Sequence, residues 1–352
     1  RLERPHFFFN NANRLLHAAG GTSLFTPPKA CERIRIPFFV PIVPTGVCMQ
    51  ESLAKILSFV AFIVLGYILR RTGVLKAETF HAVSGLVIYV TLPCVIAANL
   101  NGIRIEGTML LIALFGFAAN ILLLTYAWIL TLRTKDRDMR DFIRLNLGGF
   151  SVGPFAVPYV SAFYPSHGVL ATCVFDVGNV IMSGGGTYAL ISGSRVQTTF
   201  RAAVKLIASK LVRSGPLVAF AVMVVLSLFS LKLPQGVVEI AKIGAAANAF
   251  LCMIMIGESI DLSMTLKKFL IVARIVALRI IPCIALAWFA YHYIPADDEV
   301  RKALVLTCLA PMPAMSLIYT ASLGLDLAMA ANLSSVCVAV SIASMSVALM
   351  IM

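Results

Sequence analysis

A lone acidic residue in an apolar stretch is the first group in this sequence that could do chemistry. Residues 175–179 read Phe-Asp-Val-Gly-Asn, with Asp176 among apolar neighbours and Asn179 three positions later. Positions i and i+3 share a helix face, so we expect the carboxylate and the amide to share a site. Inside a membrane such a carboxylate is expensive and usually marks an ion or proton pathway. A structural carboxylate satisfied by a neighbour is the alternative.

Two pairs of prolines interrupt other apolar stretches. Pro154 and Pro158 lie in NLGGFSVGPFAVPYV, and Pro311 and Pro313 lie in LAPMPAMS. A proline removes a backbone donor and clashes with the preceding turn, so both stretches are expected to unwind, unless the pairs are simple kinks. Unwound helices expose N–H groups at one tip and C=O groups at the other, which offers an anion site beside a cation site.

Amide and hydroxyl side chains accompany these prolines. Asn146, Ser151 and Ser316 lie on the two interrupted stretches and are candidates for binding a substrate carboxylate. Each could instead be an interhelical hydrogen-bond partner. Asn248 and Asn332 are weaker candidates for the same polar cavity.

Arg279 is the other deep charge, three residues before Pro282. It could meet a substrate carboxylate, or it could neutralise Asp176 or Glu258, or lie in a polar pocket. Glu258 itself falls near the end of its apolar stretch, where solvation is the simplest expectation.

The sequence does not favour an enzyme. Residues 149–153 match the G-x-S-x-G motif of hydrolases, but that motif needs a strand-to-helix turn and a histidine in reach. The five histidines, at 6, 17, 81, 167 and 292, lie in the N-terminal tail or near the ends of apolar stretches. The eight cysteines stand singly without C-x-x-C spacing, which favours apolar packing over metal binding. No nucleotide motif is present, and no cofactor is predicted.

Composition defines the elements that must position these residues. Apolar residues make up 60% of the 352 and charged residues only 13%, about half the charged share of soluble domains, so the solvent must be lipid. Ten apolar runs are long enough to cross a bilayer as helices, which predicts an all-α polytopic membrane protein. The predicted spans are 53–69, 80–100, 108–131, 145–164, 168–192, 215–231, 236–257, 268–291, 300–320 and 325–352.

The charge balance of +13 reflects topology rather than a nucleic-acid partner, because the basic residues lie in short connections. Connections after odd-numbered spans hold sixteen Lys and Arg residues, and those after even-numbered spans hold four. The positive-inside rule then puts both termini outside a cell membrane, for which the plasma membrane is the natural choice.

The chain also looks doubled. Five spans precede a basic stretch at 193–214 and five follow it, so the halves must insert with opposite orientation. We therefore expect inverted five-helix repeats at about 49–192 and 215–352, with spans four and nine discontinuous and crossed. Residues 1–48 are expected to form a targeting segment, a disordered tail or non-native sequence upstream of a start at Met49, the last being favoured.

Several motifs carry a family resemblance over roughly 53–352. They are GYILRRTGVLK and VSGLVIYVTLPCVI in the first two spans, N-x-G-x-F-x-x-G-x-F-x-x-P at 146–158, FDVGN at 175–179, IGE at 256–258, R-I-I-P at 279–282 and Ala-Pro at 310–311. In order and spacing they resemble the bacterial branch of the auxin efflux carrier family, part of the ten-span bile acid, arsenite and auxin transporters.

The resemblance implies a scaffold, a transport domain and a substrate site beside crossed spans four and nine. Asn146 and the 154–158 and 311–313 segments would line that site, and Asp176 would correspond to the ion-coupling carboxylate. Asn248 stands near a usual proline of span seven, and this departure leaves the choice open among malate, malonate, other carboxylates and indole acetate.

The sequence predicts a secondary carrier of a small organic anion, driven by H⁺ or Na⁺. An uncoupled channel or uniporter on the same scaffold, or a membrane receptor or sensor, is the alternative. The expected partners are the anion, the coupling ion and the lipid bilayer, with no nucleic acid, and a homodimer stays open.

Overall fold

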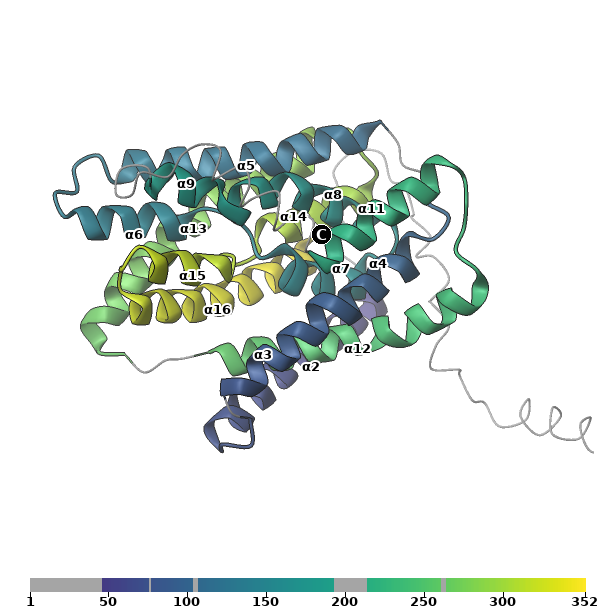
Figure 1. Ribbon diagram of the computed structural model, residues 1–352, viewed down its shortest axis with the longest axis horizontal. Helices are drawn as coiled ribbons and strands as arrows, with labels where there is room; N and C mark the ends of the chain where they lie inside the picture. Colours follow the sequence, from purple (N-terminus) through teal and green to yellow (C-terminus); the bar gives the residue numbers. More distant parts are fainter. Residues whose placement is uncertain (1–45, 76, 104–106, 193–213, 261–263) are drawn as a thin grey trace, which may run out of the picture. The chain divides into compact units, whose positions relative to one another are not determined.

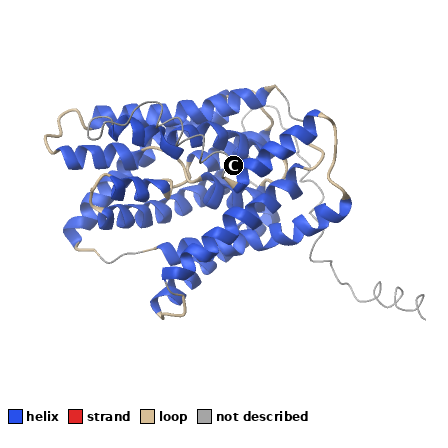
Figure 2. Ribbon diagram, viewed as in Figure 1, coloured by secondary structure: helices blue, strands red, loops and turns tan. Residues whose placement is uncertain are grey.

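The computed structural model describes residues 46–75, 77–103, 107–192, 214–260 and 264–352. The described chain belongs to one compact unit, Val43–Met352. Within those ranges the chain forms helices and connecting loops, with no strand (Figure 2). The expectations for residues 1–45 and for most of the basic stretch 193–214 lie outside the described residues.

The helices follow the predicted order of apolar runs (Figure 1). The first half contains α2 (Gly46–Arg71), α3 (Ala77–Leu86), η1 (Val87–Thr91), α4 (Leu92–Leu100), α5 (Thr108–Leu130), α6 (Arg137–Leu147), η2 (Val152–Ala156), α7 (Val157–Phe163), α8 (His167–Ile181), η3 (Met182–Gly186) and α9 (Thr187–Ser192). The second contains α11 (Gly215–Leu228), α12 (Gln235–Ser259), α13 (Leu266–Tyr293), α14 (Asp298–Cys308), α15 (Met315–Ser322) and α16 (Leu327–Ile351). The three η elements are π-helical turns, which often occur at functional sites.

Seven helices in the described ranges are long and apolar enough to cross a membrane. They correspond to predicted spans one, two, three, five, seven, eight and ten. Predicted span six is α11, which has 14 residues. Predicted spans four and nine each consist of two shorter helices separated by irregular backbone, so neither forms a single long helix. The polytopic helical class is therefore confirmed.

One of the two breaks differs from the sequence prediction in position. The first lies at residues 148–151, before Pro154, and the helix leading into it begins at Arg137 rather than at residue 145. Gly149 explains this placement, because its φ of +78° is a left-handed conformation that favours glycine. Pro154 lies in the first turn of the next helix, where a missing N–H breaks no helical bond. The second break, at residues 309–314, does contain Pro311 and Pro313.

The helices pack into two groups. The first helix group contains α2, α3, η1, α4, α11 and α12, and the second contains α5 to α9 with their π-helical turns and α13 to α16. Figure 1 shows α2, α3, α4 and α12 running together in the lower part of the view. Helices α2 and α12 pack very closely, since a Cβ added to Gly257 would lie 2.0 Å from the Ile63 carbonyl oxygen. The groups meet where α4 and α11 contact α8, where α7 contacts α12, where α2 contacts α16 and where η1 contacts η2.

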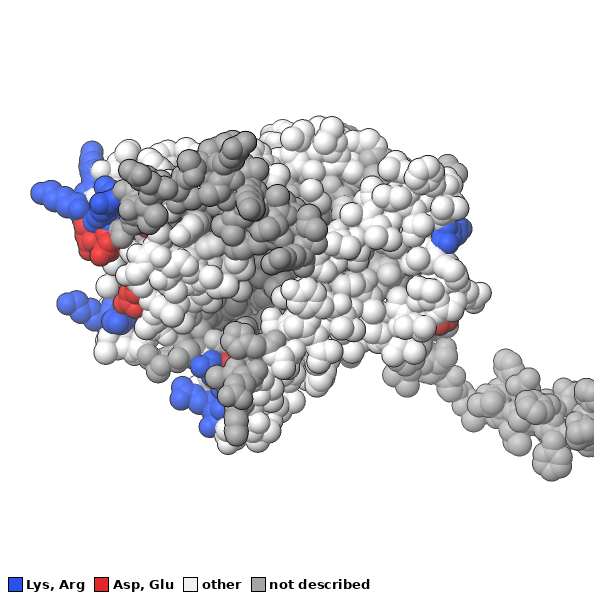
Figure 3. Space-filling view, viewed as in Figure 1, with Lys and Arg blue, Asp and Glu red and all other residues white. Residues whose placement is uncertain are grey.

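Charged side chains mark the helix ends rather than the helix faces. On the face in Figure 3, Lys and Arg gather at the end that holds the start of α6 and at the α2–α3 connection, with far fewer at the opposite end. Asp141, Glu258 and Arg279 differ from these exposed charges, because their side chains are 2%, 3% and 4% exposed. The expectation that Glu258 is solvated at its helix end is wrong, because α12 packs closely on α2 there and Arg70 donates to the Glu258 backbone carbonyl.

Candidate functional site

The two helix breaks lie against each other. The Ser151 N–H donates to the Pro311 carbonyl oxygen at 2.8 Å, which joins residues 160 positions apart in sequence. A Cβ added to Gly149 would lie 2.7 Å from Cγ of Pro313, so the backbone of one break lies directly on the ring of the other. We call this contact, residues 148–151 against 309–314, the crossing. It brings together two of the four predicted prolines, Pro311 and Pro313, with Ser151.

Arg279 binds the crossing through backbone carbonyls. It lies at the centre of α13, is 4% exposed, and donates to the Leu147 carbonyl and, at 2.6 Å, to the Gly149 carbonyl. A longer contact of 3.4 Å reaches the Ala310 carbonyl of the other break. Leu147 is the last residue of α6, whereas Gly149 and Ala310 lie in the breaks that follow α6 and α14, where a carbonyl has no partner within a helix. Of the three roles open to Arg279 from sequence, the structure shows the polar pocket, formed by these carbonyl groups.

The hypothesis that Arg279 neutralises an acidic side chain finds no support in the described part of the chain. The ion pairs there join basic residues to acids at helix ends, and none includes Arg279. Its other neighbour is an aromatic ring, since the guanidinium carbon lies 5.6 Å from the centre of the Phe150 ring. Asp176 and Arg279 therefore reach the crossing through separate sets of contacts.

Asn179 and Asp176 approach the crossing from α8. Asn179 is 1% exposed, and its amide both accepts from the Phe150 N–H at 3.1 Å and donates to the Phe150 carbonyl at 3.0 Å. The same Nδ2 donates to Oδ1 of Asp176 at 2.8 Å, so the two side chains are in contact, as their i, i+3 spacing indicated. Asp176 is half-buried. A change at its carboxylate can thus be transmitted through one amide to the backbone of the first break.

Asn120 extends this network from α5. Its Nδ2 donates to Oδ1 of Asn179 at 3.2 Å and to the Gly116 carbonyl at 2.8 Å. The Phe150 backbone fixes which way the Asn179 amide faces, and that in turn fixes the Asn120 amide. Oδ1 of Asn120 is left buried without a hydrogen-bond partner. The sequence analysis missed this residue, although an amide near the middle of an apolar span was the signal that could have found it.

Asn146 lies just before the first break and Ser316 just after the second, and both contact the Thr320 hydroxyl. Asn146 is 1% exposed and donates to the Thr320 hydroxyl of α15 at 3.1 Å. Ser316 is 3% exposed, and its carbonyl accepts from the same hydroxyl at 2.7 Å. Thr320 was not predicted, but it joins the two candidates. Asn146 and Thr320 therefore form an interhelical hydrogen bond between α6 and α15, whereas the Ser316 carbonyl bonds within α15.

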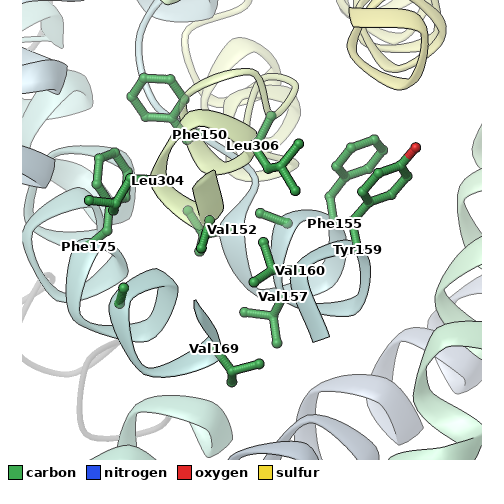
Figure 4. Packing of buried hydrophobic residues seen from close by; sticks show 14 of the residues in the cluster. Phe150, Val152, Phe155, Val157, Tyr159, Val160, Val169, Phe175, Leu304 and Leu306 are labelled. Carbon is green, nitrogen blue, oxygen red and sulfur yellow. The ribbon is translucent and has the colours of Figure 1, made fainter. Parts of the chain in front are cut away.

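Large apolar side chains enclose the crossing (Figure 4). Phe150 packs edge-on against Phe175 of α8, with ring centres 5.5 Å apart. Figure 4 shows Val152, Phe155 and Tyr159 of η2 and α7 close to Leu306 of α14. Pro158 is buried in this packing, at the start of α7, and Pro154 is half-buried. The polar groups of the crossing are therefore shielded from bulk solvent, which strengthens each electrostatic contact.

Two weaker candidates lie elsewhere. Asn332 is buried near the start of α16. Asn248 is 1% exposed on α12 of the first helix group, where its Oδ1 accepts from the Thr91 hydroxyl at 2.7 Å. Among the described residues no cluster of three or more His, Cys, Asp or Glu could hold a metal ion.

The fold and these buried polar contacts define a polytopic α-helical membrane protein with two broken helices in contact. Comparison with models of known protein families and with curated protein sequences found no match.

Proposed function

We propose that the chain is a secondary carrier of a small organic anion, built like the auxin efflux carriers. The observation that carries the proposal is the hydrogen bond from Ser151 to Pro311, which joins two helix breaks from the two halves of the chain. Irregular backbone inside a membrane is tolerated only where protein or a water-filled cavity covers it. Carriers place substrate and coupling-ion sites at such discontinuous helices.

The electrostatics of the crossing favour an anion. Four helix ends meet there, the C-terminal ends of α6 and α14 and the N-terminal ends of η2 and α15. Arg279 occupies carbonyls at both C-terminal ends, so it cancels the negative ends of the helix dipoles. The N-terminal ends of η2 and α15 carry the positive ends of their helix dipoles, which attract negative charge, although the Ser316 and Leu317 N–H groups donate to the Pro313 and Ala314 carbonyls. A carboxylate beside Ser151 and Ser316 would lie at these positive ends.

The two helix groups support a moving-part mechanism. Under the ten-span topology the first group contains spans one, two, six and seven, two from each half, and the second contains the remaining six. This division is expected for inverted repeats in which one part carries the site and the other is a scaffold. The gathering of basic side chains at one end agrees with odd-numbered connections in the cytoplasm and both termini outside. We place the protein in the plasma membrane.

Asp176 is proposed to bind the coupling ion, H⁺ or Na⁺. Its carboxylate accepts from Asn179, and Asn179 binds both backbone groups of Phe150 in the first break. A cation bound to Asp176 would compete with the Asn179 amide for the carboxylate oxygen. It would thereby alter the hydrogen bonds between Asn179 and the Phe150 backbone. The unpartnered Oδ1 of Asn120 is a further oxygen that could accept from water or ligate a cation.

Counterflow in proteoliposomes tests the proposal. Vesicles loaded with unlabelled succinate, malate or indole acetate should accumulate the labelled form of the same compound against the concentration gradient of the label, because a carrier exchanges substrate across the membrane. A channel, the alternative function, would only equilibrate the label, and a receptor would move none. Pro313→Ala should impair exchange more than it impairs folding, because continuing the helix would withdraw backbone groups from the crossing. If that variant exchanges normally while folded, the site is misplaced.

A further inference from the structure

An amide group with no acceptor lies in the middle of the first helix group. Asn248 is at the centre of α12, which runs from Gln235 to Ser259, and its side chain is 1% exposed. Its Oδ1 accepts from the Thr91 hydroxyl at 2.7 Å and from the Cys252 thiol at 3.7 Å. Its Nδ2 is fully buried and has no hydrogen-bond partner. Buried polar groups are almost always paired, so this amide needs an explanation.

Reversing the amide does not remove the problem. With the nitrogen toward Thr91, the amide would donate to the hydroxyl, the hydroxyl would donate to the Val87 carbonyl at 3.4 Å, and the amide oxygen would be the unpaired atom. In the observed orientation Oδ1 accepts from both the hydroxyl and the thiol, and the unpaired atom is the nitrogen. This orientation leaves two N–H bonds of Asn248 available to an acceptor oxygen.

Asn248 is linked through Thr91 to the contact between the two helix groups. Thr91, its hydrogen-bond partner, is the last residue of the π-helical turn η1. The next residue, Leu92, lies within 3.6 Å of a Cβ built on Gly153, in the first turn of η2. In addition, η1 packs on η2 and α12 packs on α7. The unpaired amide is thus one hydrogen bond and one residue away from a contact between the two helix groups, at the N-terminal end of a broken helix.

The surroundings of Asn248 make it selective. In the described residues of the first helix group, the buried polar side chains are Thr91, Asn248 and Glu258, and Glu258 is ten residues further along α12, near its end. Lys55 of α2 also reaches the second group, donating to the Ala162 carbonyl of α7 at 3.0 Å, but its side chain is exposed. A buried amide that donates from the first helix group can distinguish two kinds of ligand. It favours one with an oxygen at the end facing the amide over one that is apolar at that end.

We propose that Asn248, oriented by Thr91, is a second binding point for the anion and donates a hydrogen bond to an oxygen at the end remote from the crossing. The inference rests on the proposed carrier function and narrows the ligand to an anion with oxygen at both ends. One end would be held by the helix N-termini of the crossing. The other, a hydroxyl, carbonyl or second carboxylate, would be held by the Asn248 amide.

Stability and transport of Asn248→Leu together test this assignment. Leucine keeps the branched shape of asparagine, although it is larger, and removes an unpaired buried amide, so the ligand-free variant should melt at a higher temperature than wild type. Thr172→Val is the matched control, because the Thr172 hydroxyl is paired with the Gly168 carbonyl and with Thr307. It should lower the melting temperature and leave substrate preference unchanged.

Succinate and butyrate are the probes, because they share chain length and one carboxylate but differ at the far end. In counterflow competition, wild type should prefer succinate, and Asn248→Leu should weaken succinate about tenfold while leaving butyrate unchanged. Equal weakening of both probes, unchanged preference, or a lower melting temperature for Asn248→Leu would overturn the assignment and make the amide structural. Absence of exchange for any anion in wild type would instead reject the carrier function, and with it this inference.

Discussion

Replacing Arg279 by methionine should unfold the crossing, because this side chain supplies donors to both breaks. Arg279→Met keeps length and volume but removes the guanidinium. Two short charge-assisted hydrogen bonds, to Leu147 and Gly149, are lost, and at about 1.5–3 kcal/mol each they contribute roughly 3–6 kcal/mol. The 3.4 Å contact with Ala310 adds little. The buried charge is itself expensive, so we expect a net loss near the lower end, about 3 kcal/mol.

Thermal unfolding of the purified protein without added substrate is the measurement. Arg279→Met should melt well below wild type, and Arg279→Lys should lie between them, because one ammonium cannot reach carbonyls in the fork geometry of guanidinium. Arg71→Met is the control, since Arg71 is exposed and, among the described residues, donates to the Tyr67 hydroxyl at 3.1 Å and lies over the Tyr67 ring. It should change stability by less than about 1 kcal/mol.

A structural role of Arg279 and a role as substrate ligand predict different results. If Arg279 were a substrate ligand with little structural role, Arg279→Met would melt like wild type and would lose only its response to added anion. That outcome would refute the reasoning from backbone carbonyls. A variant that is destabilised without substrate, and that is still stabilised by whichever anion stabilises wild type, would support it.

Three further predictions concern topology, the crossing and coupling. A cysteine in place of Ser166 should react with an impermeant thiol reagent from outside the cell, and one in place of Lys135 should not; reversed labelling would invert every site assignment. Gly149→Ala should destabilise the protein and abolish exchange, because its φ is +78° and the new Cβ would lie 2.7 Å from the Pro313 ring, whereas Gly236→Ala, with no atom near, should do neither. Asp176→Asn should fold and exchange substrate but fail to accumulate it against a gradient; normal accumulation would remove Asp176 from the coupling role.

Much of the architecture could be read from the sequence for a simple physical reason. Apolar runs of span length must be helical in lipid, since no other single segment satisfies its own backbone, so the helix order followed from composition alone. The shared site of Asp176 and Asn179 was also predictable, because i, i+3 spacing is a property of the helix itself. Proline chemistry likewise indicated which two spans break.

Tertiary structure decided what these elements do to one another. The sequence could not show that Arg279 binds carbonyls at both breaks rather than an acid, because its partners come from backbone about 30 and 130 residues away. The first break falls at Gly149 rather than at Pro154, since the close approach of Pro313 leaves no room for a side chain there. Helix periodicity fixes which residues share a face, but which faces meet, and which buried amide is left without a partner, depends on packing between segments distant in sequence.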